Sequence, residues 1–156
     1  MVKKSINLSS NLVPAGKAPI VRQDLKHYYI RGTVVHGNHL GSTLGYPTAN
    51  IQPHQDQPAM IPNGVYLVSV LLQERKFFGL CNIGNRPTIG GKQLVIEVNI
   101  LDFSEDIYGK DISIKVIRAI RKEKKFQNLT QLVDQINFDK EKVMKILSVL
   151  LKDQTS

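Results

Sequence analysis

Cysteine is almost absent from this sequence: Cys81 is the only one among 156 residues, so the chain cannot form an internal disulfide, and a reducing compartment suits it. Cys81 lies in an apolar run between Leu80 and Asn82, which favours a buried thiol over a nucleophile because free cysteine usually behaves as a small hydrophobic side chain. None of the four histidines has a Cys or His partner at zinc-ligand spacing, which argues against a metal cage.

Long apolar runs are also missing. No stretch approaches the roughly 18 apolar residues of a membrane span. Lys3 and Lys4 are followed by polar residues and not by the apolar segment of a signal peptide. We therefore expect a soluble, cytoplasmic protein.

Acidic residues are outnumbered, with 21 Lys and Arg against 13 Asp and Glu and a formal net charge of +8. Such a balance suits an anionic partner, either a nucleic acid or a phosphorylated small molecule. Many of the basic residues lie between residues 118 and 125 and on the helices expected after them, where a charged face is usually only solvated. No nucleic-acid-binding signature accompanies the charge, so we do not expect a nucleic-acid partner.

Short strand-like segments, separated by turn residues, fill the middle of the chain. The segment 93–101 alternates cleanly, with Leu94, Ile96, Val98 and Ile100 on one face and Val95, Glu97 and Asn99 on the other. Similar runs cover residues 29–36, 64–72, 75–83 and 112–120, and Gln73-Glu74 is a short hairpin connection. Together they predict a mainly β fold, an antiparallel sheet closed into a small barrel.

The spacing of apolar residues changes from that of a strand to that of a helix near the C-terminus, where one or two helices should follow the barrel. Apolar residues recur at helical spacing from Leu129 to Ile136, with Asn128 as the N-cap. Asp139 is a candidate cap of a second helix, whose apolar face would be Val143, Ile146, Leu147, Leu150 and Leu151. Residues 1–27 show little periodicity, so we interpret them as an N-terminal extension and residues 28–152 as one domain.

A loop with three glycines precedes a threonine and an asparagine that are two residues apart. Gly37, Gly41 and Gly45 could bring backbone N–H groups close to a phosphate, because no Cβ blocks the approach. Thr48 and Asn50, two residues apart in an extended segment, would offer two oxygens to one small cation beside a polyphosphate. The alternative is an ordinary surface turn, since the loop matches neither the Walker A nor the G-x-G-x-x-G pattern.

Glu97 is the sharpest catalytic candidate. It lies mid-strand between Ile96 and Val98, where a carboxylate is a poor strand former. It could simply be solvated, or it could be a general base held on a rigid strand. Further candidates lie in the segments 82–88, 101–109 and 121–126, whose aromatic residues could either stack on a flat ring or pack in the core; these are Phe103, Tyr108 and Phe126.

Taken together, these segments resemble the riboflavin kinase family. The family's motifs stand here in family order: the glycine loop ending in Pro-Thr-Ala-Asn, Asn-Gly-Val-Tyr, Asn-Ile-Gly-x-x-Pro-Thr, a strand Glu, Leu-Asp-Phe-x-x-Asp-Ile-Tyr-Gly and Ile-Arg-x-Glu-x-x-Phe. They occupy residues 37–50, 63–66, 82–88, 97, 101–109 and 120–126. The resemblance extends from about Ile30 to Asp139.

The resemblance implies a Greek-key barrel that uses Mg²⁺ and ATP to phosphorylate the ribityl 5′-hydroxyl of riboflavin, giving FMN. It implies that Glu97 is the base and that Thr48 and Asn50 hold Mg²⁺ against the ATP phosphates. It also implies nucleotide contacts by Gly37, Gly41, Gly45, Thr48, Asn82 and Gly84, and flavin contacts by Arg121, Phe126 and Tyr108. The alternative is a regulatory module that keeps the barrel and binds flavin or nucleotide with little turnover.

Two departures from the family pattern matter for activity. Many bacterial members have Gly-Arg in the first loop, where this sequence has Gly41-Ser42 and so lacks a charge that could assist phosphate binding. In many bacteria the kinase is joined to an N-terminal half that adenylylates FMN to FAD. Residues 1–27 are too few for such a domain, so we expect FMN to be the end product.

Overall fold

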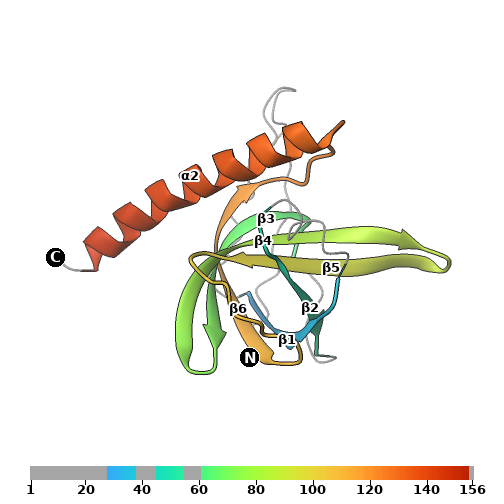
Figure 1. Cartoon of the computed structure of the whole chain (residues 1–156), viewed down its shortest axis with the longest axis horizontal. Helices are drawn as coiled ribbons and strands as arrows, with labels where there is room; N and C mark the ends of the chain where they lie inside the picture. The colour runs from blue at the N-terminus through green and yellow to red at the C-terminus, as the bar shows by residue number, and fades with distance from the viewer. Residues whose placement is uncertain (1–27, 38–44, 55–60, 155–156) are drawn as a thin grey trace, which may run out of the picture.

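The computed structural model describes residues 28–37, 45–54 and 61–154, which form six strands and one long helix (Figure 1). The predicted extension, residues 1–27, lies outside this part of the chain, as do Gly41 and Ser42. The elements are β1 (Tyr29–Val35), β2 (Ala49–Pro53), β3 (Gly64–Leu72), β4 (Arg75–Thr88), β5 (Gly91–Ile100), β6 (Asp111–Arg121) and α2 (Leu129–Asp153).

The strands close into a barrel in the order β1-β2-β5-β4-β3-β6, and every neighbouring pair is antiparallel. Three consecutive strands, β3, β4 and β5, are joined by hairpins, and β2 lies beside β5, which is the Greek-key arrangement. The predicted small antiparallel barrel is confirmed. A consequence for the site is that β2, distant in sequence, lies directly beside β5.

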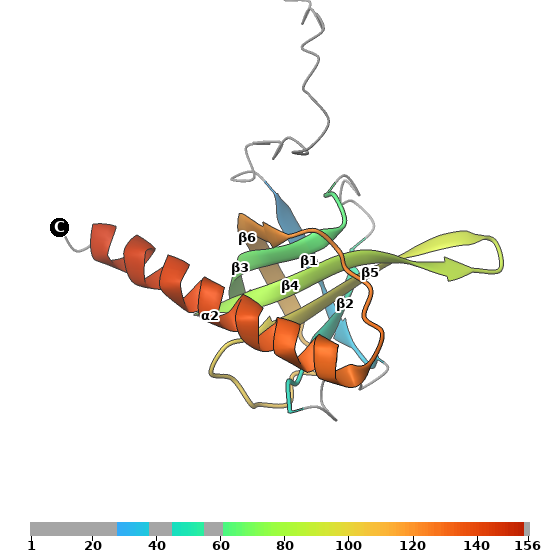
Figure 2. The ribbon, with the colours of Figure 1, turned by 90° about the horizontal axis from the view of Figure 1, so that it is seen from above.

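Local sequence accounts for most strand bounds. Gln73 and Glu74 have φ of 48° and 66°, the left-handed pair that a two-residue hairpin needs between β3 and β4. The sequence predicts β2 only as an extended segment. The strand is five residues long, ends in a proline and buries only Ile51, so its apolar pattern is weak. The strand β4 continues to Thr88, and with β5 it forms an arm that extends beyond the barrel in both views (Figures 1 and 2).

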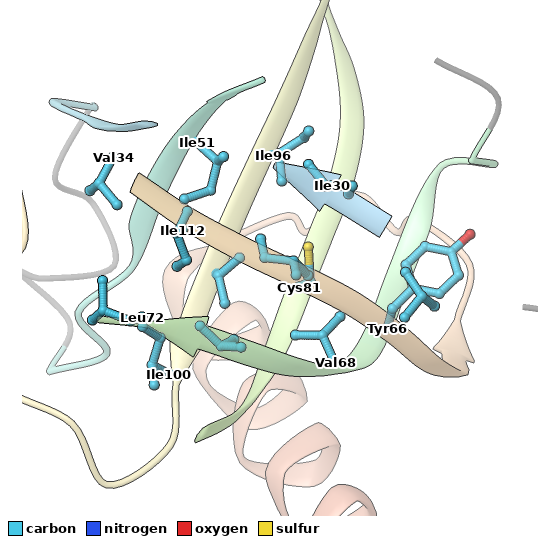
Figure 3. Packing of buried hydrophobic residues seen from close by; sticks show 14 of the residues in the cluster. Ile30, Val34, Ile51, Tyr66, Val68, Leu72, Cys81, Ile96, Ile100 and Ile112 are labelled. Carbon is cyan, nitrogen blue, oxygen red and sulfur yellow. The ribbon is translucent and has the colours of Figure 1, made fainter. Parts of the chain in front are cut away.

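The barrel interior is filled by the inward-facing, alternate residues of all six strands. Figure 3 shows Ile51, Ile96 and Ile112 converging from β2, β5 and β6. Cys81 is fully buried among them, and burial, followed by the nearby charge of Glu97, raises the pKa of its thiol to about 12. The prediction of an inert, buried cysteine is therefore confirmed.

The C-terminal prediction of a second helix capped by Asp139 is wrong. A single helix, α2, runs without a break from Leu129 to Asp153, and Asp139 lies in its middle. No Gly or Pro interrupts the segment, and the apolar spacing continues from Ile136 through Val143 to Leu147. Asn128 is the N-cap as expected, since its side-chain oxygen accepts a hydrogen bond of 2.9 Å from the Gln131 backbone N–H.

Helix α2 crosses the outside of the barrel over β3, β4 and β6, and its C-terminal end projects beyond the barrel (Figures 1 and 2). Its apolar face completes a second core, in which Val143 and Leu147 pack with Val65, Leu67, Leu80 and Ile120. Among the described residues no helix is long and apolar enough to cross a membrane. The helix thus turns one part of the barrel's outer face into a sheltered surface.

Candidate active site

A row of polar side chains crosses three adjacent strands on this outer face. In the strand register Glu97 of β5 is directly opposite Asn50 of β2 on one side and Asn82 of β4 on the other. Directly paired residues of an antiparallel sheet project to the same face. Glu97 therefore lies between two amide side chains, whereas its chain neighbours Ile96 and Val98 are buried inside the barrel.

The row continues along the strands. Thr48 and Asn99 lie two residues from Asn50 and Glu97, respectively, and border the same space. Asn99 Nδ2 donates a 2.8 Å hydrogen bond to the carbonyl of Pro47, which fixes the turn that presents Thr48. The expectation that the Thr48 and Asn50 side chains share one side agrees with this arrangement.

These polar groups form one end of a cavity of about 340 Å³, here called the main cavity, which lies between the barrel, α2 and the segment that follows β6. Its other walls combine an apolar surface with charged side chains, from elements far apart in sequence. The apolar part comes from Val65, Leu80, Phe126, Leu132 and Ile136, and the charged side chains are those of Arg86, Glu123, Lys124 and Asp139. A cavity with broad apolar walls and a few clustered polar groups is the usual form of a site for a largely apolar small molecule. Arg121 also lines it.

The segment 121–126, which begins at the last residue of β6, is held in place at Arg121 and at Glu123. Arg121 Nε donates to Asp139 Oδ2 at 2.8 Å, and its guanidinium carbon lies 5.8 Å from the centre of the Phe126 ring. Asn63 Nδ2 donates to a carboxylate oxygen of Glu123 at 3.3 Å. The segment therefore forms a wall of the main cavity.

The turn before β2 is tied to the helix as well. The Tyr46 hydroxyl donates a hydrogen bond to Asn137 Oδ1, and the ammonium of Lys140 lies 5.0 Å from the centre of the Tyr46 ring. These contacts connect the turn that carries Thr48 with α2, which walls the apolar part of the main cavity. The contacts of Tyr46 therefore fix the polar end of the main cavity relative to its apolar wall.

Tyr108 lies elsewhere. It borders a second cavity of about 210 Å³, together with Thr48, Phe103 and Ser104, and its ring stacks on His36 with 3.9 Å between ring centres. Arg121 and Phe126 are not among the residues lining this second cavity. The structure thus does not bring Tyr108 together with the other two residues predicted to contact flavin. Thr48 lines both cavities, so they lie next to each other at this residue.

The glycines predicted to approach a nucleotide differ in their surroundings. A Cβ at position 37 would lie 1.9 Å from Asn50 Nδ2, so Gly37 makes room for that side chain. A Cβ at position 84 would lie 2.6 Å from a Glu123 carboxylate oxygen, so Gly84 allows the segment 121–126 to approach β4. Gly45 has φ of +80° in the turn before Thr48. None of these three lines the main cavity.

The residues predicted to hold Mg²⁺ are a hydroxyl and an amide, not carboxylates. Mg²⁺ accepts such oxygen ligands, but it is usually held by few protein groups together with water and substrate phosphates. No group of three or more His, Cys, Asp or Glu residues in the described ranges is arranged to hold a metal ion by itself. The donor set therefore fits a cation that arrives with a polyphosphate.

Sequence reasoning missed several residues of this site. Asn99 has the same alternation as Glu97, so the strand pattern could have identified it. Tyr46 and Glu123 lie within recognised motifs, but the partners of Tyr46 come from α2 and the partner of Glu123 is Asn63, just before β3. No local signal shows those contacts. The spacing of Leu132 and Ile136 predicts the apolar face of a helix but not a cavity wall, because helical periodicity does not distinguish a core face from the lining of a cavity.

Comparison with known proteins agrees with this geometry. A family model described as riboflavin kinase matches residues 25–147. The bifunctional riboflavin kinase/FMN adenylyltransferase of Bacillus subtilis (strain 168) is 39% identical over 128 residues, covering 80% of this chain and 40% of the relative. The chain thus spans less than half the length of that relative.

Two solved structures are similar in fold. A riboflavin kinase from Trypanosoma brucei superposes with a TM-score of 0.57 at 29% identity, over 77% of this chain and 79% of that one. A Streptococcus pneumoniae protein described as a macrolide-efflux protein superposes with a TM-score of 0.69 at 42% identity, over 72% of this chain and 37% of that one.

Proposed function

The chain belongs to the riboflavin kinase family, and on this premise we propose that residues 28–152 form a kinase domain that transfers the γ-phosphate of ATP to the ribityl 5′-hydroxyl of riboflavin, giving FMN and ADP. One observation carries the proposal: a strand carboxylate, Glu97, stands between Asn50 and Asn82 in a cavity that also has an apolar wall broad enough for a flat ligand. An ATP-using enzyme with a single buried cysteine suits the cytoplasm.

Glu97 would accept the proton of the attacking hydroxyl. Phosphoryl transfer depends mainly on positioning and charge stabilisation, and a carboxylate that orients and deprotonates the acceptor hydroxyl adds to both. The oxygen of the ribityl chain forms the new bond to phosphorus, the bond to the ADP oxygen breaks, and the proton passes to the Glu97 carboxylate. Rigid strands on both sides keep that carboxylate in place.

The flavin would occupy the main cavity. Its ring system is large, flat and mostly apolar, which suits the wall formed by Leu80, Phe126 and Ile136. The ribityl chain would then extend along the polar row toward Glu97. Arg121, on the same wall, would donate to acceptor atoms of the flavin.

The nucleotide would occupy the side of the second cavity. Two substrates of a direct transfer must meet at the reacting atoms, and the two cavities lie next to each other at Thr48. Tyr108 and Phe103 would then border the adenine side, which revises the flavin contact expected of Tyr108 from the sequence. Thr48 and Asn50 would hold Mg²⁺, which would supply positive charge to neutralise the transferring phosphoryl group.

The direct test is incubation of the purified chain with riboflavin, ATP and Mg²⁺, followed by chromatographic separation of the flavins. We expect FMN and ADP in equal amounts, no FMN when ATP is omitted or Mg²⁺ is chelated, and no FAD. Tight riboflavin binding without FMN formation would contradict the kinase proposal and favour the regulatory module. Accumulation of FAD would contradict the assignment of a single reaction.

A further inference from the structure

Asp139 is the one polar or charged residue that is buried within the described part of the chain, with 3% of its surface exposed. Its carboxylate has two partners, one on each oxygen. Oδ2 accepts a 2.8 Å hydrogen bond from Arg121 Nε, and Oδ1 accepts a 2.9 Å hydrogen bond from Gln135 Nε2, one helical turn earlier. A carboxylate supported at both oxygens is fixed in orientation.

The same contacts fix the Arg121 guanidinium. Its Nη1 donates to the Lys122 carbonyl at 3.1 Å, and its plane is limited on one side by the Phe126 ring. Only Nη2 makes no hydrogen bond to another described residue. Because Arg121 lines the main cavity, this nitrogen is the donor that remains for a ligand there.

The backbone directs Arg121 to this place. The register between β3 and β6 shifts twice, between Val65 and Tyr66 and between Leu67 and Val68, so β6 contains extra residues near its end. Such bulges change which face a side chain occupies. Up to Val116 the alternate residues of β6 fill the barrel, whereas Ile120 packs under α2. Arg121 therefore ends β6 beside the helix and the main cavity.

Helix α2 is attached to the barrel by other contacts besides the one that Asp139 makes. Val143 and Leu147 pack against the barrel's outer face, and Lys142 Nζ donates to the Ile120 carbonyl at 2.9 Å. A buried ion pair is also a poor stabiliser compared with apolar packing, because both charges lose their hydration. What an ion pair supplies that apolar packing cannot is a fixed direction for the guanidinium.

We propose that Asp139 is a positioning residue that, supported by Gln135, holds the Arg121 guanidinium so that its remaining nitrogen donates to an acceptor atom of the flavin in the main cavity. This inference rests on the proposed function. Asp139 also borders the main cavity, but it is 3% exposed and both of its carboxylate oxygens already accept hydrogen bonds from the protein. It acts through Arg121, so its effect should appear in flavin affinity and disappear when Arg121 is altered.

The test measures riboflavin dissociation constants by quenching of flavin fluorescence, a readout independent of turnover. Asp139→Asn should raise the dissociation constant about tenfold, the value of one hydrogen bond from a charged donor, and leave the KM for ATP unchanged. The matched control is Asp134→Asn, which removes a charge from an exposed position of the same helix and should change neither constant. Gln135→Ala should raise the dissociation constant to a smaller extent, and it serves if Asp139→Asn does not fold.

A double variant separates positioning from simple destabilisation. In an Arg121→Gln background, Asp139→Asn should cause no further rise in the riboflavin dissociation constant, whereas thermal unfolding can respond to both changes. The proposal is overturned if Asp139→Asn lowers the melting temperature but binds riboflavin like the wild type, or if its effect on binding multiplies with that of Arg121→Gln. A wild-type chain that binds riboflavin but forms no FMN would instead refute the kinase proposal and leave this one intact.

Discussion

At the scale of single residues, the proposed function depends on three side chains that meet only through strand pairing. Asn50, Glu97 and Asn82 are distant in sequence but directly opposite one another in the register. The sequence indicated Glu97 because a carboxylate interrupts an apolar alternation. It could not indicate that both its cross-strand neighbours are amides, because the pairing of β2 with β5 is a property of the closed barrel.

Thr48→Ala and Asn50→Ala should both weaken productive use of Mg²⁺. Each removes one oxygen donor from the junction of the two cavities, and Mg²⁺ tolerates little distortion of its coordination. We expect the Mg²⁺ concentration for half-maximal FMN formation to rise at least about tenfold in each variant. Full activity of both variants at limiting Mg²⁺ would mean that this segment is only a turn.

Gly37→Ala should weaken the use of Mg²⁺ as Asn50→Ala does, although Asn50 itself is unchanged. A methyl group at position 37 would overlap the Asn50 amide and force it out of the row. The Mg²⁺ titration should shift in the same direction as for Asn50→Ala. Gly90→Ala is the control, because a Cβ at position 90 meets nothing within 4 Å, and it should leave the titration unchanged.

At the scale of elements, the helix and the barrel's outer face build the site together. The strand pattern predicted five of the six strands, and the helical period predicted the apolar face of α2. The break at Asp139 was a wrong prediction for a physical reason: an Asp is common at N-caps, and the sequence does not reveal that its carboxylate is paired with Arg121 on β6. The Asp139 carboxylate therefore pairs with Arg121 and does not cap a helix.

The N-cap of α2 should influence both stability and flavin binding. Asn128→Ala removes the hydrogen bond to the Gln131 backbone and should lower the free energy of unfolding by about 1 kcal/mol. Because Leu132 lies in the next turn and lines the main cavity, riboflavin affinity should fall slightly as well. Thr130→Ala, an exposed change in the same turn, should not destabilise the protein in denaturant titrations. Equal stability of Asn128→Ala and wild type would contradict this account of the helix start.

At the scale of the whole molecule, the barrel brings two cavities together at Thr48. Closure into a small antiparallel barrel could be predicted from the length and spacing of the strands, whereas the Greek-key connectivity came only from the family resemblance. The proposed division of the site into a flavin side and a nucleotide side could not be predicted from the sequence. Tyr108 and Phe126 both follow strands, and both carry rings that suit a flat ligand. Only the position of the β5–β6 connection distinguishes them.

Tyr108→Ala should therefore raise the KM for ATP and spare riboflavin. Loss of one aromatic stacking partner of a base should weaken nucleotide binding about tenfold. Tyr29→Ala removes an exposed tyrosine on β1 that lines neither cavity and serves as the control. A selective rise in the riboflavin KM would instead restore Tyr108 to the flavin side.

The most direct test of the central claim is single-turnover FMN formation by Glu97→Gln, with riboflavin affinity measured on the same preparation. Gln keeps the size and hydrogen-bonding capacity of Glu97 but cannot accept the hydroxyl proton as a carboxylate does. We predict that the rate of FMN formation falls about 10²- to 10⁴-fold, the usual effect of losing a general base, while the riboflavin dissociation constant changes little. A near-wild-type rate in this variant would contradict the claim that Glu97 in the main cavity performs the proton transfer.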